Sequence, residues 1–527
     1  MIEIDPRLLL AKLAFGPTAR DLEEITRAGT DRWVDEQLRP TDDDCAARIA
    51  SARWRLKYRV PNPAFSGAAP HAAPQFLEVD EDRPIAVAGP IEEQWRVVAD
   101  NRPGPERTFF RQAVSVATLL RAVHSRWRLR ELLVDFWHNH FNVNAVGDAL
   151  VAVSLPSYDR DVIRTHALGN FRAFLEAVAG SAAMQVYLNN RSSRGGAANE
   201  NYGRELFELH TMGRPAYLNA LYSRWRDVPG AAQGKPQGYI DQDVYEAARA
   251  FTGWTIEDGS GLGGGRKLPI TGKPTYVEMW HDNYQKRVLA TEFDPYQPAM
   301  ADGRKVLDLV ADHPATARYV CGKLCKRLVS DNPTPGLVEA TGKIWTEHRR
   351  KPRQIAEVVA AIVRSEEFRR SRGAKVKRPL ELVASFARAT GIALSVTPGL
   401  LNELDASGQR LFGWGPPTGH PDDAAYWLSS HAVHRRWSLL LGLADNAWAT
   451  GLPGIAETVA AEPTAGRAMI TAHQALFGSG PDQPTASAVL GGMGLNPTDG
   501  FARRKDASAL SRRLLAYCGM LPSFQTR

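Results

Sequence analysis

Two histidines stand two positions apart in the segment Asp135 to Val143, which also carries three aromatic residues. On a regular helix His138 and His140 would point about 200° apart, so they reach one metal ion only where the helix ends or the chain is extended. Asn142, near the end of the segment, indicates that the helix does end here. The alternative is one histidine in the core and one held by a hydrogen bond.

Carboxylates gather in a second segment, from Asn199 to His210, whose spacing predicts a helix. Arg204, Glu205 and Glu208 share one face of that helix, and the two glutamates are close enough to bind one cation. His210 lies away from this face and should not join them. The alternative is a solvated face on which Arg204 pairs with Glu208. A glycine and several aromatic residues favour close packing instead, where a buried carboxylate needs a partner.

A third segment, from Asp241 to Gly253, predicts another helix. One face combines acidic residues with alanines, which suits close approach of a neighbouring helix. We expect Arg249 on this helix to form a structural ion pair with a carboxylate of the segment 199–210.

The remaining patterns are short or fail as motifs. His281 followed by Asp282, at the end of a predicted strand, is typical of a metal ligand or a proton shuttle. The glycines from Gly259 to Gly264 have the spacing of a dinucleotide-binding loop, but they neither follow a strand of a βαβ unit nor open a helix. We interpret them as a hairpin loop. Because P-loop, nucleophile-elbow and zinc-protease motifs are also absent, no nucleotide cofactor is expected.

The composition is that of an ordinary globular protein of 527 residues, with 44% hydrophobic and 23% charged residues. The net charge of +7 comes with no basic run or recognition motif, which argues against nucleic-acid binding. The 4 cysteines lack the spacing of a disulfide framework or a zinc site. No signal peptide and no membrane span are visible, so we expect a soluble protein that is cytoplasmic or is exported bound to a signal-bearing partner.

The spacing of apolar residues predicts a mainly α fold, a multi-helix globular protein with a small inserted β-hairpin. Residues 1–300 would form an N-terminal helical part that carries the site, and residues 301–527 a C-terminal helical part. Residues 60–104, rich in alanine, proline and glycine, are predicted to be an irregular excursion. The period changes at about 254–280, where we expect the hairpin.

Several motifs in order are similar to those of domain-of-unknown-function family 1800, a bacterial family, over almost the whole chain. The matching segments are Leu8–Thr18, Phe136–Phe141, Asn199–Gly213, Asp243–Trp254, His281–Asp282, Lys323–Arg327, Ser365–Phe368 and Pro379–Val383. The resemblance implies a shared site at three of these segments, Phe136–Phe141, Asn199–Gly213 and His281–Asp282, which carry the signature residues of the family. Members are often encoded beside family 1501, which resembles sulfatases and phosphatases, so a family 1501 protein is an expected partner. The half after residue 314 also resembles planctomycete proteins that can carry cytochrome c domains, which favours redox chemistry.

The first hypothesis is a metal-dependent enzyme acting on a small-molecule or polymer substrate, with oxidation favoured over hydrolysis. A mixed set of imidazole and carboxylate ligands suits Fe, Mn or Zn, and the ligands would be His138, His140, His281, Glu205 and Glu208. The catalytic groups would be Glu205, Arg204, Arg249 and Asp282. Glu205 would be a general base, the arginines would hold an anionic group, and Asp282 would orient His281.

Two alternatives use the same residues without a metal. The cluster could be a buried network of ion pairs that fixes the core of a binding or assembly module. It could also be a hydrolase that uses a carboxylate and a histidine. The network predicts that Glu205→Ala sharply lowers stability.

Overall fold

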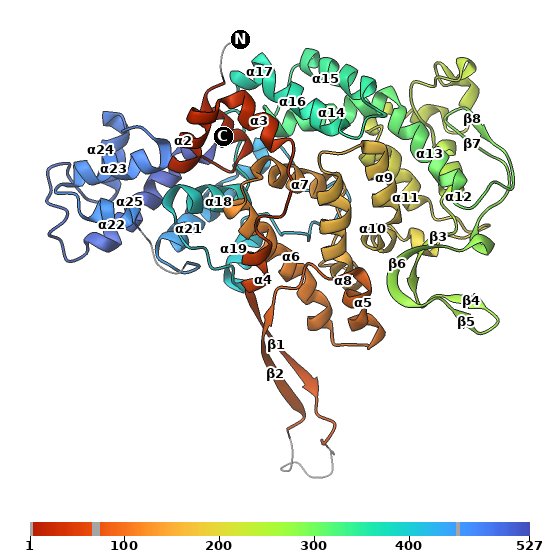
Figure 1. Cartoon of the computed structure of the whole chain (residues 1–527), viewed down its shortest axis with the longest axis horizontal. Helices are drawn as coiled ribbons and strands as arrows, with labels where there is room; N and C mark the ends of the chain where they lie inside the picture. Colours follow the sequence, from red (N-terminus) through yellow and green to blue (C-terminus); the bar gives the residue numbers. More distant parts are fainter. Residues whose placement is uncertain (1–3, 66–73, 450–453) are drawn as a thin grey trace.

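The structure, a computed structural model, describes residues 4–65, 74–449 and 454–527, and its fold is mainly α, which confirms the predicted class (Figure 1). Up to residue 300 the α-helices are α1 (Pro6–Leu13), α2 (Ala19–Ala28), α3 (Thr30–Gln37), α4 (Ala46–Ser51), α5 (Ile91–Ala99), α6 (Gly104–His124), α7 (Arg128–His140), α8 (Ala149–Ser157), α9 (Phe171–Gly180), α10 (Ala182–Tyr187), α11 (Glu200–Glu205) and α12 (Asp241–Ala250). Two of them, α8 and α11, continue directly into π-helices, η1 (Tyr158–Arg164) and η3 (Leu206–His210).

The second half is helical, as predicted. Its helices are α13 (Ala301–Asp312), α14 (Pro314–Leu328), α15 (Pro335–Glu347), α16 (Gln354–Arg364), α17 (Glu366–Arg369), α18 (Pro379–Thr390), α19 (Pro398–Ala406), α20 (Ala424–Trp427), α21 (Ser430–Ala444), α22 (Ile455–Ala460), α23 (Ala465–Phe477), α24 (Gln483–Gly492), α25 (Ala507–Met520) and α26 (Pro522–Gln525). One hydrophobic core runs through both halves, from Ile4 to Phe524. Within the described ranges no helix has the length and apolar character needed to cross a membrane.

The prediction of an irregular excursion over residues 60–104 is wrong. Strand β1 (Arg53–Pro61) pairs antiparallel with β2 (Phe76–Pro84), and α5 follows. The hairpin projects from the helical body in Figure 1, and residues 66–73 lie outside the described chain. Charged side chains pair across the strands, as in Arg55 Nε to Asp80 Oδ1 at 2.7 Å. Because β2 is mostly polar on both faces, apolar periodicity gives no signal for it.

The hairpin predicted near 254–280 is confirmed. Strand β3 (Trp254–Asp258) pairs antiparallel with β6 (Ile270–Tyr276), and the glycine run lies in the connection, which carries the short strands β4 (Gly261–Gly263) and β5 (Arg266–Lys267). A further small hairpin follows, β7 (Lys286–Val288) with β8 (Thr291–Phe293). His281 does not end a strand as predicted, because a 3₁₀ turn, Glu278–Trp280, separates it from β6.

A buried ion-pair network ties the two halves together. Arg327 on α14 is fully buried and contacts Asp135 on α7 at 2.9 Å and Glu381 on α18 at 3.2 Å. The side chain of the C-terminal residue Arg527 reaches the same Glu381 at 2.9 Å and donates to the backbone oxygen of Lys12 on α1 at 2.8 Å. The two arginines that share the Glu381 carboxylate therefore connect the second half of the chain to α7 and α1 of the first half.

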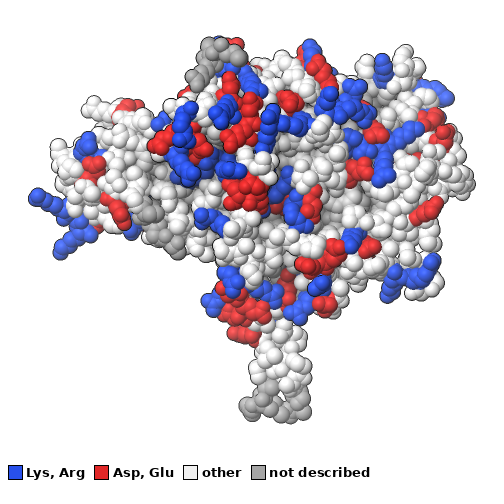
Figure 2. Space-filling view, in the orientation of Figure 1, with Lys and Arg blue, Asp and Glu red and all other residues white. Residues whose placement is uncertain are grey.

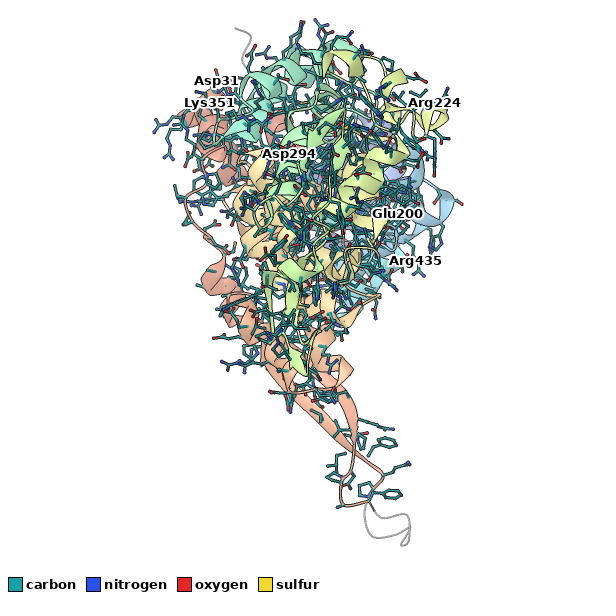
Figure 3. The ribbon with its side chains drawn as sticks, turned by 90° about the vertical axis from the view of Figure 1, so that its right-hand side faces the viewer. Asp31, Glu200, Arg224, Asp294, Lys351 and Arg435 are labelled. Atoms are coloured by element: carbon teal, nitrogen blue, oxygen red, sulfur yellow. The ribbon has the colours of Figure 1, made fainter. Side chains whose placement is uncertain are left out.

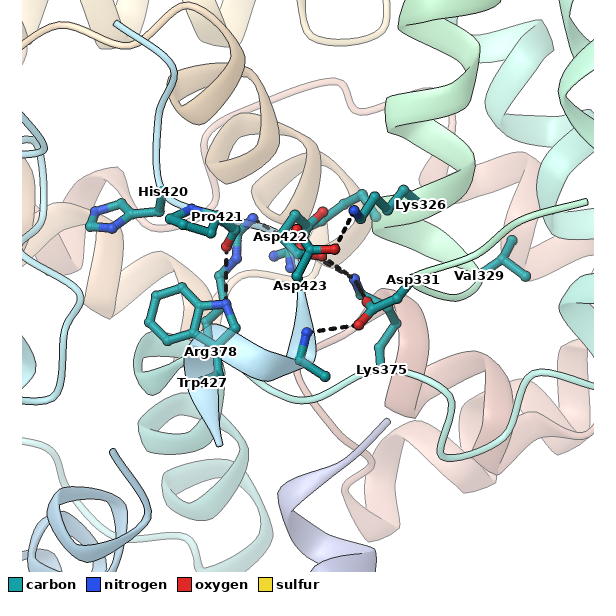
Figure 4. Close-up of polar contacts among 12 residues, drawn as sticks. Lys326, Val329, Asp331, Lys375, Arg378, His420, Pro421, Asp422, Asp423 and Trp427 are labelled. Atoms are coloured by element: carbon teal, nitrogen blue, oxygen red, sulfur yellow. Dashed lines mark hydrogen bonds and ion pairs between the residues drawn. The ribbon is translucent and has the colours of Figure 1, made fainter. Parts of the chain in front are cut away.

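The network continues to the loop before α20, as Figure 4 shows. Asp422 there contacts Arg378 at 3.1 Å and Lys375 at 3.3 Å, and Lys375 also pairs with Asp331. Because a buried charge is tolerated only when it is paired, these contacts fix the loop against α14 and α18.

We predict that Glu381→Ala lowers the free energy of unfolding by about 3 kcal/mol or more, because it leaves the buried Arg527 without its carboxylate and Arg327 with Asp135 alone. Burial alone would raise the pKa of Glu381, but Arg327 and Arg527 outweigh it and lower that pKa to about 2. The stability that the ionised Glu381 contributes is therefore present above pH 4.5 and is lost as the pH falls toward 2. Urea unfolding across this range measures both effects. The control is Glu339→Ala, whose exposed carboxylate pairs only with Lys343; equal losses in the two variants would contradict the assignment.

Candidate functional site

The first two motif segments meet at the end of α7. His140 Nε2 lies 3.1 Å from the backbone oxygen of His210 on η3, and the rings of Phe141 and His210 lie with their centroids 5.2 Å apart. Nearby, burial and then the charge of Glu205 raise the pKa of Tyr187 to about 12, while the side-chain amide of Asn142 acts in the opposite direction. The segments that carry the predicted site are therefore neighbours in space.

The second and third motif segments pack as closely as predicted. A β-carbon at Gly203 on α11 would lie 2.9 Å from the backbone oxygen of Val244 on α12, closer than two such atoms can approach. Beside this contact the rings of Tyr202 and Phe251 meet edge to face, with centroids 5.0 Å apart. Glycine is therefore required at residue 203, and the contact fixes the helix that carries Glu205.

Glu205 is half-buried at the last position of α11, and no hydrogen bond or ion pair joins its carboxyl group to any part of the chain that the structure describes. Burial, and then the charge of Glu208 three residues on, raise the pKa of Glu205 to about 7. Arg204 acts in the opposite direction but does not compensate. The carboxyl group can therefore exchange a proton near neutral pH.

A loop that the sequence analysis missed is fixed beside this region. The Tyr187 hydroxyl donates to the backbone oxygen of Gly415 at 2.6 Å, and the Asn142 amide donates to that of Pro416 at 2.8 Å. Asn139 donates to the backbone oxygen of His420 at 2.9 Å and accepts from its nitrogen at 2.7 Å. The polar residues of the first motif thus hold the loop 414–420 in place. The only sequence signal was the run of prolines and glycines in that loop.

The structure does not show the five predicted metal ligands gathered at one point. His138 and His140 both lie within α7, which ends only after His140, so they point to different sides. His138 Nε2 contacts Asp159 at 3.0 Å, whereas His281 Nε2 contacts Asp302 at 3.2 Å. Among the residues placed by the structure, no three His, Cys, Asp or Glu side chains are arranged to hold a metal ion. Binding of Fe, Mn or Zn stays a prediction.

Two predicted pairings involving the third motif are wrong. Arg249 does not reach the segment 199–210; it binds both carboxylate oxygens of Asp282, at 2.8 and 3.1 Å, and Glu246 at 2.7 Å. Asp282 is therefore occupied and does not orient His281. Asp302, on the following helix, takes that place and also contacts Lys286 at 2.8 Å. These partners come from later parts of the chain, which local spacing does not show.

The alternative pairing of Arg204 with Glu208 is also not formed. Arg204 lies 3.5 Å from Asp241 and 3.6 Å from Glu200, and about a third of its side chain is exposed. Glu208 is 3.8 Å from Arg214, whose side chain is 84% exposed. Arg204 and Glu208 of the second motif are therefore each held only by long ion pairs.

A second group of ionisable residues includes His210, the last residue of η3. Burial, followed by the charge of Lys323 on α14, lowers the pKa of His140 and brings that of His210 to about 3. Burial lowers the pKa of Lys323 itself to about 8. Both imidazoles are therefore neutral, and the lysine charge opposes a cation beside them. The sequence analysis did not single out Lys323, which carries no local motif for such a role.

The family described as "Protein of unknown function (DUF1800)" matches residues 8–526. The chain belongs to this family. The DUF1800 match includes both helical halves and the hydrophobic core that joins them. No curated protein and no solved structure matches the chain significantly.

We predict that Glu205→Gln stabilises the protein at pH 8, on the order of 1 kcal/mol after allowance for solvent screening, and much less at pH 5. The pKa of Glu205 is raised in the folded state, so its favourable contribution is complete below pH 4.5 and is lost as the pH rises through about 7. Urea unfolding at the two pH values measures this. The matched control is Glu200→Gln at the start of the same helix, labelled in Figure 3. Destabilisation of Glu205→Gln at pH 8 would contradict an unpartnered carboxyl and support the buried network.

Proposed function

We propose that the protein is an enzyme in which Glu205 performs acid–base chemistry in a hydrolytic reaction. The observation that carries this proposal is the isolation of the Glu205 carboxyl group. Asp159, Asp282 and Asp302 nearby are each held by positively charged side chains. A half-buried carboxyl without such a partner costs stability, which is typical of a functional group.

The surroundings support proton transfer at Glu205. Glu208 repels a negative charge there and so favours the protonated form at neutral pH. In the reaction, the Glu205 carboxylate would take a proton from the attacking water and then return it to the leaving group. Arg204, which precedes it, has only long ion pairs and is partly exposed, so its guanidinium group is available to an anionic part of the substrate.

The metal-dependent reaction is a second candidate. It is favoured by the mutual repulsion of Glu205 and Glu208, which a divalent cation would relieve. Elemental analysis for Fe, Mn and Zn, on the wild type and on the double variant Glu205→Gln/Glu208→Gln, separates the candidates. Metal in the wild type alone supports the second candidate, and an equal metal content in the two proteins contradicts it.

The expected partner, a family 1501 protein, rests on the family resemblance and is tested by co-purification.

Hydrolysis is tested with nitrophenyl esters, phosphate monoesters and glycosides. We expect the wild type to turn over one class, with a change in kcat/KM at an apparent pKa of about 7. Glu205→Gln should lower kcat/KM by about 10²–10⁴-fold, the usual loss for a general acid or base. The control Glu339→Gln should leave it unchanged, because the exposed carboxylate of Glu339 pairs with Lys343 on α15 and neither residue is part of the proposed site. The proposal would be overturned if Glu205→Gln kept full activity, or if kcat/KM of the wild type showed no change with pH near 7.

A further inference from the structure

A cavity of about 820 Å³ opens beside α4 and η1, and Glu205 does not line it. Its wall is formed by the segment 38–50, residues 85–88 before α5, η1 with the residues after it, and residues 352–353 before α16. We call it the arginine basin, because six arginines line it: Arg39, Arg121, Arg130, Arg160, Arg164 and Arg353.

Four of these arginines are already paired with carboxylates. Arg121 contacts Asp43 and Asp159, and Arg164 contacts Asp159 and Glu131. Arg160 pairs with Asp161, and Arg130 with Glu131. These ion pairs form part of the wall of the basin, and the carboxylates largely neutralise the charge of the four arginines.

Arg39 and Arg353 differ from the other four. Neither forms an ion pair within the described chain, and they lie next to each other, because Arg353 donates to the backbone oxygen of Leu38 at 3.4 Å. The Nη2 atom of Arg130 in the same wall is buried without a hydrogen-bond partner. Buried polar atoms are almost always partnered, so this one points to a missing acceptor. The basin therefore presents unused donors whose natural partner is an anion.

Apart from Thr41, Thr165 and the three carboxylates of Asp42, Asp43 and Asp159, which are already paired with arginines, the rest of the wall is apolar. Ile49, Ile85, Val87 and Leu168 line the basin together with several alanines and prolines. A small inorganic anion would leave this surface without a contact, whereas a hydrocarbon body would bury it. A cavity of this volume has room for a ligand of drug size.

The geometry points to a binding site for an amphipathic organic anion in the arginine basin. The acidic head group, a phosphate monoester or a carboxylate, binds Arg39 and Arg353, and its hydrocarbon body lies against the apolar wall. This site is separate from the one proposed around Glu205 and does not depend on it.

Isothermal titration of the full-length protein with decyl phosphate, below the concentration at which it forms micelles, tests the site. We expect saturable 1:1 binding, weakened about tenfold or more in the double variant Arg39→Gln/Arg353→Gln. The matched control is Arg364→Gln on α16, whose guanidinium group pairs with Asp35 at the surface and does not line the basin. It should bind like the wild type. Circular dichroism verifies that each variant is folded.

Two further measurements separate the head group from the body. Decanol and inorganic phosphate should each bind at least about tenfold more weakly than decyl phosphate. Ala88→Trp, which keeps every charge but fills part of the basin, should also weaken binding. The proposal is overturned if no saturable binding occurs, if the double variant binds as the wild type does, or if either half of the ligand binds as well as the whole.

Discussion

The structure depends on the pairing of buried charge. Arg327 is fully buried inside the helical core, and only its contacts with Asp135 and Glu381 make that tolerable. The same carboxylate of Glu381 receives Arg527, so the C-terminus closes onto helices from both halves. On the face shown in Figure 2, lysine and arginine side chains are interspersed with acidic ones rather than collected in one patch. The charges on this face are thus arranged so that opposite signs are neighbours (Figure 2).

Because most buried charges in this protein are paired, a buried ionisable group without a partner is a candidate functional residue. Glu205 directly precedes η3 and Lys323 lies on α14, and burial moves their pKa values toward neutrality from opposite directions, to about 7 and about 8. The π-helix contributes to this arrangement, because it widens the turn directly after Glu205 and sets His210 against α7. Such segments occur frequently at functional sites. The second π-helix, η1, carries Asp159, the partner of His138.

Local signals in the sequence predicted local structure well. Periodicity gave the mainly α class, alternation gave the hairpin around β3 and β6, and the glycine of α11 indicated close packing, for which the structure shows α12 as the partner. The first strand of the hairpin of β1 and β2 does alternate, with Trp54 and Leu56 buried, but β2 is exposed along most of its length and gives no matching apolar signal, so the pair was missed. The partner of His281 and the loop 414–420 were missed because contacts between distant segments leave no mark in local spacing. Helical periodicity also could not reveal that the helix after Glu205 changes to a π-helix.

The central claim is that Glu205 keeps a free carboxyl group that titrates near neutral pH. Carbon-13 NMR of protein labelled at the glutamate side-chain carboxyl carbon measures it directly, and the Glu205→Gln variant assigns the resonance. The account predicts one carboxyl signal that titrates at about pH 7 and is absent from the variant. A signal for Glu205 that titrates near the ordinary value of 4.5 would contradict it.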